Sequence, residues 1–384
     1  MGDAVERFRV DVPQATLDDL ARRLDQTRFP ARLPGAGWDF GTDQDALRDL
    51  VTDWRDRYDW RATEARLNEF EQSTTEIDGQ QIHFLRARSP EPDALPLVLT
   101  HGWPGSLVEF LGVIGPLSDP RAAGGDPADA FDLVIPSLPG YAFSGPTHER
   151  GWDPGRIARA WAQLMARLGY ERYGAQGGDW GSFVTSQLAL ADPDHVAGIH
   201  LNMIAANPGR DDPSTFTDDE QSDLAAFVHY TDDEGGYLRI QSTRPHTLGF
   251  ALEDSPVGLC AWIVEKFRAW SDCDGDLARC FTNDQLLDNV MLYWVTGTAT
   301  SSVRLYYEFD KALRAGRLDL GSRIETPTGY ARYPKEIMRT SKRWAERQYH
   351  LVHYANLPRG GHFAAMEQPA LFVDDVRTFF RSVR

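Results

Sequence analysis

Apolar side chains recur at helical spacing through the first 73 residues. The apolar residues of 17–24 stand at positions i, i+3, i+4 and i+7, and those of 47–54 repeat this spacing. Thr16, with Asp19 three places later, is a capping-box-like start for the first helix. A stretch with prolines and glycine separates the two runs. Residues 1–73 are therefore expected to form a helical N-terminal domain.

The spacing of the apolar positions changes at residue 74 to one typical of strands. Residues 74–77 and 81–86 flank Asp78-Gly79, a pair that favours a tight hairpin turn. Further apolar runs predict strands at 95–100, 131–136, 170–176, 196–204, 324–333 and 351–355. Helices are expected between or after them at 153–168, 180–191 and 368–381. Short buried strands that alternate with helices indicate an α/β fold with a mostly parallel sheet covered on both faces.

The strand spacing is absent from residue 208 to about residue 318. This region is helical in character and rich in acidic and aromatic residues, which fits a cap inserted into the sheet domain. We therefore expect four segments: an N-terminal helical leader domain at 1–73, the first part of the core at 74–207, a helical cap at 208–318, and the second part of the core at 319–384.

Charge and cysteine content exclude several classes of protein. The chain has 57 acidic and 40 basic residues and a net charge of −17, which argues against a nucleic-acid partner. No stretch approaches the ~20 apolar residues that a membrane span needs, so no membrane partner is expected. The three cysteines form no C-x-x-C pair, so neither a metal site nor a disulfide framework is expected. These features predict a reduced, cytoplasmic protein.

The segment Gly177-Gly178-Asp179-Trp180-Gly181 has the small-x-nucleophile-x-small form of a nucleophile elbow. In such an elbow a strand turns sharply into a helix, so residues two before and two after the nucleophile must be small. A glycine next to an aspartate is more often only a turn, and its neighbours in the chain decide between the two interpretations. The elbow interpretation makes Asp179 the nucleophile of an α/β-hydrolase fold.

Three other segments stand where this fold would need them. An apolar strand is followed by His101-Gly102-Trp103-Pro104-Gly105. In this fold the loop at that place gives one backbone N–H to the oxyanion hole, and the residue after the nucleophile, here Trp180, gives the second. Glu336 follows the strand predicted at 324–333, and His362 follows the last one. The order nucleophile, acid, histidine is that of the fold, so Asp179, Glu336 and His362 are the candidate catalytic residues.

An aspartate nucleophile narrows the reaction. A carboxylate attacks a saturated carbon and forms an ester with its own side chain. His362 would then activate a water that hydrolyses this ester, and Glu336 would orient the imidazole. The leaving group is an epoxide oxygen or a halide, and an epoxide oxygen needs a proton donor. Tyrosines of the predicted cap could supply that proton; they are Tyr230, Tyr237, Tyr293, Tyr306 and Tyr307.

At this point the chain resembles the microsomal-type epoxide hydrolase family, which includes juvenile-hormone and xenobiotic-metabolising enzymes. The resemblance spans nearly the whole chain and is closest to a soluble bacterial branch without the membrane anchor of mammalian members. The segments that carry it are His101 to Gly105, Gly177 to Gly181, Asp254 to Leu259, Leu292 to Trp294 with Thr296 to Thr298, and Arg359 to Ala365.

The resemblance implies roles for individual residues. Asp179 would be the nucleophile, His362 the base and Glu336 the acid. The two cap tyrosines of the family fall on Tyr237 and Tyr306, although a slip of one residue in the alignment would select Tyr307. It also implies a cis bond between Trp103 and Pro104, and Pro104 and Tyr307 are candidate substrate-binding residues.

The same resemblance implies the reaction and its reactants. A small-molecule epoxide and water would give a vicinal diol, with no cofactor. Some actinobacterial relatives act in natural-product pathways, including enediyne assembly, in which an aryl epoxide is opened. The aromatic content of the leader makes a homodimer plausible.

Two other functions remain open. A haloalkane dehalogenase shares an aspartate nucleophile followed by tryptophan, and the indole N–H of Trp180 could bind the halide. A non-catalytic ligand-binding protein could use the same fold, although a binder has no need of Asp179, Glu336 and His362 together.

Overall fold

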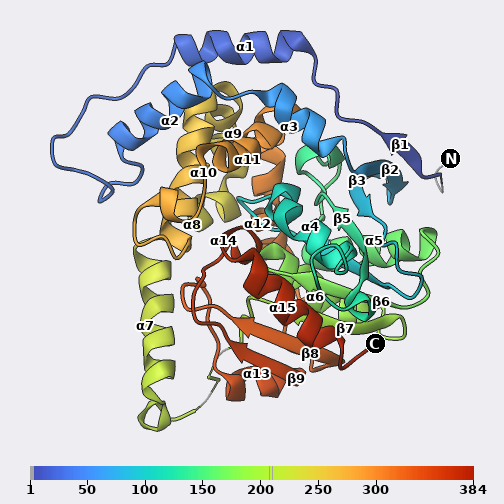
Figure 1. Ribbon diagram of the computed structural model, residues 1–384. Helices are drawn as coiled ribbons and strands as arrows, with labels where there is room; N and C mark the ends of the chain where they lie inside the picture. Colours follow the sequence, from blue (N-terminus) through green and yellow to red (C-terminus); the bar gives the residue numbers. More distant parts are fainter. Residues whose placement is uncertain (1–3, 207, 210) are drawn as a thin grey trace.

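A computed structural model describes residues 4–206, 208–209 and 211–384, which form a sheet core with a helical layer against it (Figure 1). The described strands make one nine-stranded sheet in the order β1-β2-β3-β5-β4-β6-β7-β8-β9. Their bounds are β1 Glu6–Phe8, β2 Glu71–Ile77, β3 Gln80–Ala87, β4 Leu95–Thr100, β5 Phe131–Pro136, β6 Tyr173–Gly177, β7 Val196–Leu201, β8 Ile324–Arg332 and β9 Tyr349–Asn356. This arrangement confirms the α/β-hydrolase fold expected from the sequence.

The sheet is parallel from β5 through β4, β6, β7 and β8 to β9, and antiparallel among β1, β2, β3 and β5. Asp78 and Gly79, both at positive φ, form the hairpin turn between β2 and β3. The strand expected at 170–176 begins only at Tyr173, because Gly169 (φ 84°) ends the preceding helix and the next residues form the connection. Since parallel strands carry their C-terminal ends to one edge, the loops after β4, β6, β8 and β9 lie together there.

Helices cover both faces of the sheet (Figure 1). On one face α4 packs with α15, whose Phe379 and Phe380 lie against glycines of the strands; on the other, α5 packs with α6. These glycines leave room for the phenylalanine rings: a Cβ at Gly174 would lie 2.3 Å from Phe380. The bounds of the core helices are α4 Leu111–Ser118, α5 Pro154–Arg167, α6 Trp180–Ala191, α13 Lys342–Gln348, α14 Ala364–Glu367 and α15 Pro369–Phe380.

Among the described residues, six α-helices lie between β7 and β8, where the sequence predicts a cap. They are α7 Asp218–Asp232, α8 Gly236–Thr243, α9 Pro245–Asp254, α10 Pro256–Trp270, α11 Asn283–Thr296 and α12 Ala299–Arg314. Residue 207, the last of the predicted first core segment, and residues 1–3 of the predicted leader lie outside the described residues. Among the helices that the structure describes, none is long and apolar enough to cross a membrane.

The N-terminal region is helical, with three differences from the sequence-based prediction. Its helices are α1 Gln14–Asp25, α2 Gln44–Asp56 and α3 Trp60–Leu67. One difference is that β2 begins at Glu71, within the range 1–73 that was expected to be helical. The capping-box start at Thr16 is wrong: α1 begins at Gln14 after Pro13, and the Thr16 N–H donates to the Pro13 carbonyl inside the first turn. The short strand β1 was not expected; it pairs with β2 and extends the core sheet.

The leader is attached to the cap through a buried carboxylate. Asp288 of α11 is 2% exposed and accepts hydrogen bonds from Tyr58 (2.8 Å) and Thr63 (2.5 Å) of the leader. Arg66 of α3 forms an ion pair with the same carboxylate. A buried charge is tolerated when it is paired and hydrogen-bonded, so these contacts fix the leader helices against α11.

Removal of this carboxylate is expected to destabilise the protein. Asp288→Ala leaves the half-exposed guanidinium of Arg66 and two hydroxyls, one of them that of the buried Thr63, without their acceptor. The cost is about 1–3 kcal/mol, measurable by urea unfolding. Asp284→Ala, in the exposed first turn of the same helix, is the control and should cost less than about 1 kcal/mol. Equal midpoints for the two variants would contradict the role of Asp288.

Candidate active site

Asp179 lies in the sharp turn between β6 and α6. Its backbone has φ 49° and ψ −128°, a conformation that residues other than glycine rarely adopt. The flanking glycines allow the turn, because a Cβ at Gly177 would lie 2.1 Å from the Gly181 carbonyl oxygen and one at Gly181 would lie 1.9 Å from that of Thr100. The turn therefore needs glycine two residues before and two residues after Asp179, and it directs the carboxylate away from the sheet.

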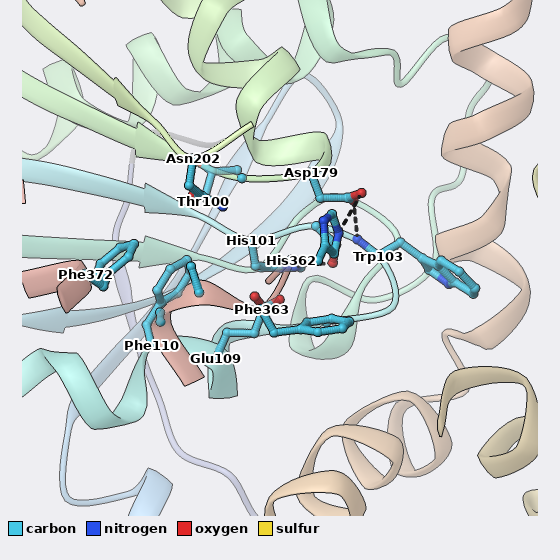
Figure 2. A pocket seen from close by; sticks show the side chains of 15 residues that line it. Thr100, His101, Trp103, Glu109, Phe110, Asp179, Asn202, His362, Phe363 and Phe372 are labelled. Carbon is cyan, nitrogen blue, oxygen red and sulfur yellow. Dashed lines mark hydrogen bonds and ion pairs between the residues drawn. The ribbon is translucent and has the colours of Figure 1, made fainter. Parts of the chain in front are cut away.

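The loop after β4 places a backbone donor on this carboxylate. The Trp103 N–H donates to Asp179 Oδ1 at 2.7 Å (Figure 2). Gly102 permits the approach, since its Cβ would lie 2.1 Å from the same oxygen. The Trp103–Pro104 bond is cis. Trp180, the other candidate donor, is the first residue of α6, where backbone N–H groups have no acceptor within the helix.

The cap helix α11 donates two hydrogen bonds to the same loop. Asn289 donates to the Pro104 carbonyl at 2.7 Å, and the Tyr293 hydroxyl donates to the Gly105 carbonyl at 2.5 Å. Both side chains are buried. The Tyr293 hydroxyl is therefore hydrogen-bonded to this loop.

His362 joins the two carboxylates that the sequence singled out. Its Nε2 lies 3.3 Å from Asp179 Oδ2, and its Nδ1 lies 2.6 Å from Glu336 Oε1. The N–H of Ile337 donates to the same Glu336 oxygen at 2.7 Å. Burial opposes the charged imidazole, but Glu336 and Asp179 outweigh it and raise the pKa of His362 well above its ordinary value. The histidine is thus held as an imidazolium between two acids.

Backbone hydrogen bonds fix the His362 loop. The His362 N–H donates to the carbonyl of Trp270, at the end of cap helix α10. Glu367 accepts the N–H groups of Gly361 (3.0 Å) and Phe363 (2.9 Å), on either side of the histidine. Burial raises the pKa of Glu367 to about 7. The loop is thereby held by both the cap and α14.

Two cap tyrosines lie near Asp179, whose negative charge acts on both hydroxyls. The rings of Tyr237 (α8) and Tyr306 (α12) are 5.8 Å apart, and both contact Trp103, at 5.2 Å and 5.8 Å. Tyr237 shares a 2.5 Å hydrogen bond with the hydroxyl of Tyr230. The buried Tyr306 hydroxyl has no partner that meets hydrogen-bond geometry among the described residues. Burial raises the pKa of both hydroxyls well above the usual value, so both stay protonated.

Tyr307 does not join this group. It lines a groove of about 390 Å³ together with His148, Arg244 and Arg304, and Lys311 lies 5.0 Å from its ring. The adjacent ring, that of Tyr306, instead packs 4.7 Å from Trp180. Because neighbouring residues of a helix point about 100° apart, only one of the two can face Asp179, and the structure places Tyr306 there.

Two residues near the site gave no usable signal in the sequence. Trp270 packs against His362 and Tyr237, with ring centroids 5.1 Å away in both cases. Glu109 lines the same small cavity as Asp179 and His362. Trp270 was one aromatic among many in the cap, and Glu109 a single acid in an apolar helical turn. Only the fold brings them to the histidine.

Metal ligands do not gather in the described part of the chain. Among its His, Cys, Asp and Glu residues no group of three or more could hold an ion. Cys260, Cys273 and Cys280 are unpaired, and burial raises the pKa of the Cys260 thiol to about 12.

Two family models match the chain. One, described as "Epoxide hydrolase N terminus", matches residues 5–110, and the other, "alpha/beta hydrolase fold", matches residues 96–234. Among curated proteins, a Stigmatella aurantiaca (strain DW4/3-1) protein named as a candidate epoxide hydrolase is 48% identical over 98% of this chain and 85% of its own length. Epoxide hydrolase 1 of Sus scrofa is 36% identical over 98% of this chain and 88% of its own.

Solved structures are similar over almost the whole molecule. The Aspergillus niger epoxide hydrolase superposes with a TM-score of 0.88 at 34% identity, over 99% of this chain and 97% of its own. The juvenile hormone epoxide hydrolase of the silkworm Bombyx mori gives 0.89 at 31% identity, over 99% and 95%. The likeness includes the leader, the core and the cap.

The charge arrangement predicts a titration that NMR can follow. His362 should remain doubly protonated at neutral pH, and Asp179→Asn should lower its pKa by about 1 to 3, because one of its two anionic partners becomes neutral. Imidazole ¹⁵N shifts recorded against pH measure this. Buried His101, whose pKa is lowered to about 4, is the internal control and should stay neutral in both proteins. An unchanged His362 titration in the variant would refute the pairing.

Proposed function

This chain belongs to the epoxide hydrolase family, and we propose that Asp179 is the nucleophile with which it opens an epoxide to a vicinal diol. The observation that carries the proposal is the position of the Asp179 carboxylate. It lies between the Trp103 N–H and the imidazole of His362, and Glu336 backs the histidine. The reactants are a small-molecule epoxide and water, and the reaction needs no cofactor.

In the first half-reaction Asp179 is alkylated. A carboxylate oxygen bonds to one epoxide carbon, and the bond from that carbon to the ring oxygen breaks. The oxygen that leaves takes a proton from one of the two tyrosine hydroxyls, Tyr237 or Tyr306, and the other donates a hydrogen bond. Their raised pKa keeps both protonated in the resting site, so two donors are ready on the cap side.

In the second half-reaction water hydrolyses the ester. Alkylation makes Asp179 neutral, so His362 loses one of the two carboxylates that hold its pKa high. The imidazolium then gives its proton to the tyrosinate that the first half-reaction leaves, and the neutral imidazole can act as a base. It deprotonates a water that attacks Cγ of Asp179. The Trp103 N–H, with that of Trp180 as the second donor, would stabilise the negative charge on the carboxyl oxygen.

Aromatic side chains around the tyrosines support an aryl epoxide as the substrate class. Trp180 contacts Tyr306 at 4.7 Å and Phe309 at 5.1 Å, and Trp103 stacks on Tyr237 at 5.2 Å. Flat rings of this kind pack well against an aryl group. A role in bacterial natural-product assembly of the enediyne type, the cytoplasmic location and a homodimer stay predictions from the sequence.

The haloalkane dehalogenase alternative has one observation on its side. The Trp180 indole N–H is buried and has no acceptor among the described residues, and a halide needs such a donor. A halide does not need an acid, however, whereas two protonated tyrosine hydroxyls suit the oxygen of an epoxide. The tyrosines therefore favour the epoxide.

The nucleophile can be tested with styrene oxide and labelled water. The wild-type protein should form the diol, and Asp179→Asn should lower kcat by about 10⁴-fold or more, as loss of a catalytic residue does. A single turnover in ¹⁸O-water should label Asp179 before the diol, which peptide mass spectrometry detects. Label that appears first in the diol would exclude the ester. Release of bromide from a bromoalkane without epoxide turnover would instead support the dehalogenase.

The two tyrosines can be separated from their neighbour by single substitutions. Tyr237→Phe and Tyr306→Phe should each slow alkylation about 10²-fold, because each removes one donor to the departing oxygen. Stopped-flow quenching of tryptophan fluorescence would follow this step. Tyr307→Phe is the matched control and should leave alkylation unchanged. A larger effect at Tyr307 than at Tyr306 would overturn the assignment.

A further inference from the structure

A small cavity beside the nucleophile has a titratable group with no assigned role. The cavity measures about 20 Å³ and is lined by Asp179, His362 and Glu109. This is room for a single water molecule, which needs two to four polar partners to be held there. The polar groups around the cavity therefore decide how such a water would be oriented.

Three of the other polar side chains at the cavity are already engaged. Thr100 accepts the Trp161 indole N–H at 3.1 Å. His101 lies 3.0 Å from the Gly102 carbonyl and accepts the Leu138 N–H at 3.2 Å. The Asn202 amide oxygen accepts from Gln176 at 2.9 Å. Among the titratable side chains of the lining, this leaves Glu109 beside Asp179 and His362.

Glu109 is built into the site by the loop after β4. It lies in the 3-10 helix Leu107–Phe110, which begins directly after that loop. Gly105 makes room for it, because a Cβ there would lie 1.6 Å from Glu109 Oε1. Figure 2 shows the carboxyl group directed toward the side on which His101 and His362 lie. Burial raises the pKa of Glu109 to about 8, His362 opposes the rise, and Asp179 adds to it.

We propose that Glu109 is a positioning residue for the hydrolytic water: it accepts one O–H of that water while His362 removes the proton of the other. This rests on the proposed function, since it concerns the ester formed on Asp179. A water that donates both O–H groups in fixed directions keeps two free lone pairs, one of which can be directed at Cγ of Asp179. Glu109 thus serves the second half-reaction and not the first.

The step balances in atoms and charge. The water oxygen bonds to Cγ, and its first proton passes to His362. The bond from Cγ to the alkyl oxygen then breaks, and His362 returns that proton to the oxygen of the leaving diol. The second proton, which Glu109 accepts as a hydrogen bond in the bound water, passes to His362 as the Asp179 carboxylate re-forms. This restores the imidazolium whose first proton had gone to the tyrosinate, so the enzyme returns to its first state.

The test measures the two half-reactions separately in Glu109→Ala and Glu109→Gln. With styrene oxide, alkylation is followed by stopped-flow fluorescence, and hydrolysis by the decay of the alkylated protein in acid-quenched mass spectra. Glu109→Ala should leave alkylation unchanged and slow hydrolysis about 10-fold to 100-fold, so that the ester accumulates. Glu109→Gln, which keeps an acceptor oxygen, should hydrolyse within about threefold of the wild-type rate.

Controls separate this inference from a loss of stability and from the proposed function. Glu64→Ala removes another buried carboxylate, one that accepts the Val12 N–H far from the site, and both of its half-reaction rates should match the wild type. If Glu109→Ala does not fold, Glu109→Met supplies similar volume without an acceptor. Equal slowing of both steps, or hydrolysis at the wild-type rate, would overturn the role of Glu109. A wild-type protein that forms neither ester nor diol would instead refute the proposed function.

Discussion

The structure of the site depends on one imidazolium held between two carboxylates, that of Glu336, which is buried, and that of Asp179, which is partly exposed. His362 lies 2.6 Å from Glu336 and 3.3 Å from Asp179, and its partners keep it charged despite burial. Each carboxylate favours the charged imidazole, so loss of either one lowers the pKa of His362. Alkylation of Asp179 would remove one of them, so the first chemical step would itself prepare the base for the second.

The cap and the leader contribute to this arrangement through one helix. On α11, Asp288 binds the leader, and the next residue, Asn289, binds the Pro104 carbonyl of the loop that contacts the nucleophile. One turn further on, Tyr293 binds the Gly105 carbonyl. The leader is far from the carboxylate of Asp179, but it fixes the helix that orients the Trp103 N–H. Leader and cap therefore support the loop after β4, whose Trp103 N–H binds Asp179.

Different groups surround Asp179 on the side of the cap and on the side of the small cavity. The cap side holds aromatic rings and the two tyrosine hydroxyls, which suit an epoxide oxygen. The other side holds the cavity of about 20 Å³ with Glu109 and His362, which suits one water. A single carboxylate can thus meet an organic substrate and water from different directions, and neither has to displace the other.

Much of the molecule follows from local sequence. The alternation of apolar strands and helices predicts the sheet, and Gly177 and Gly181 predict the elbow because each glycine lies too close to backbone for any side chain. Asp179, Glu336 and His362 each follow a predicted strand, and parallel strands end at one edge of the sheet, so the sequence also predicts that these three residues meet. The sequence did not place β1 or the start of α1, since a three-residue strand depends on its partner β2 and Pro13 outweighed the cap at Thr16. It also could not choose between Tyr306 and Tyr307 or find Glu109. Those depend on where helices separated by a hundred residues or more pack, and only the tertiary structure decided them.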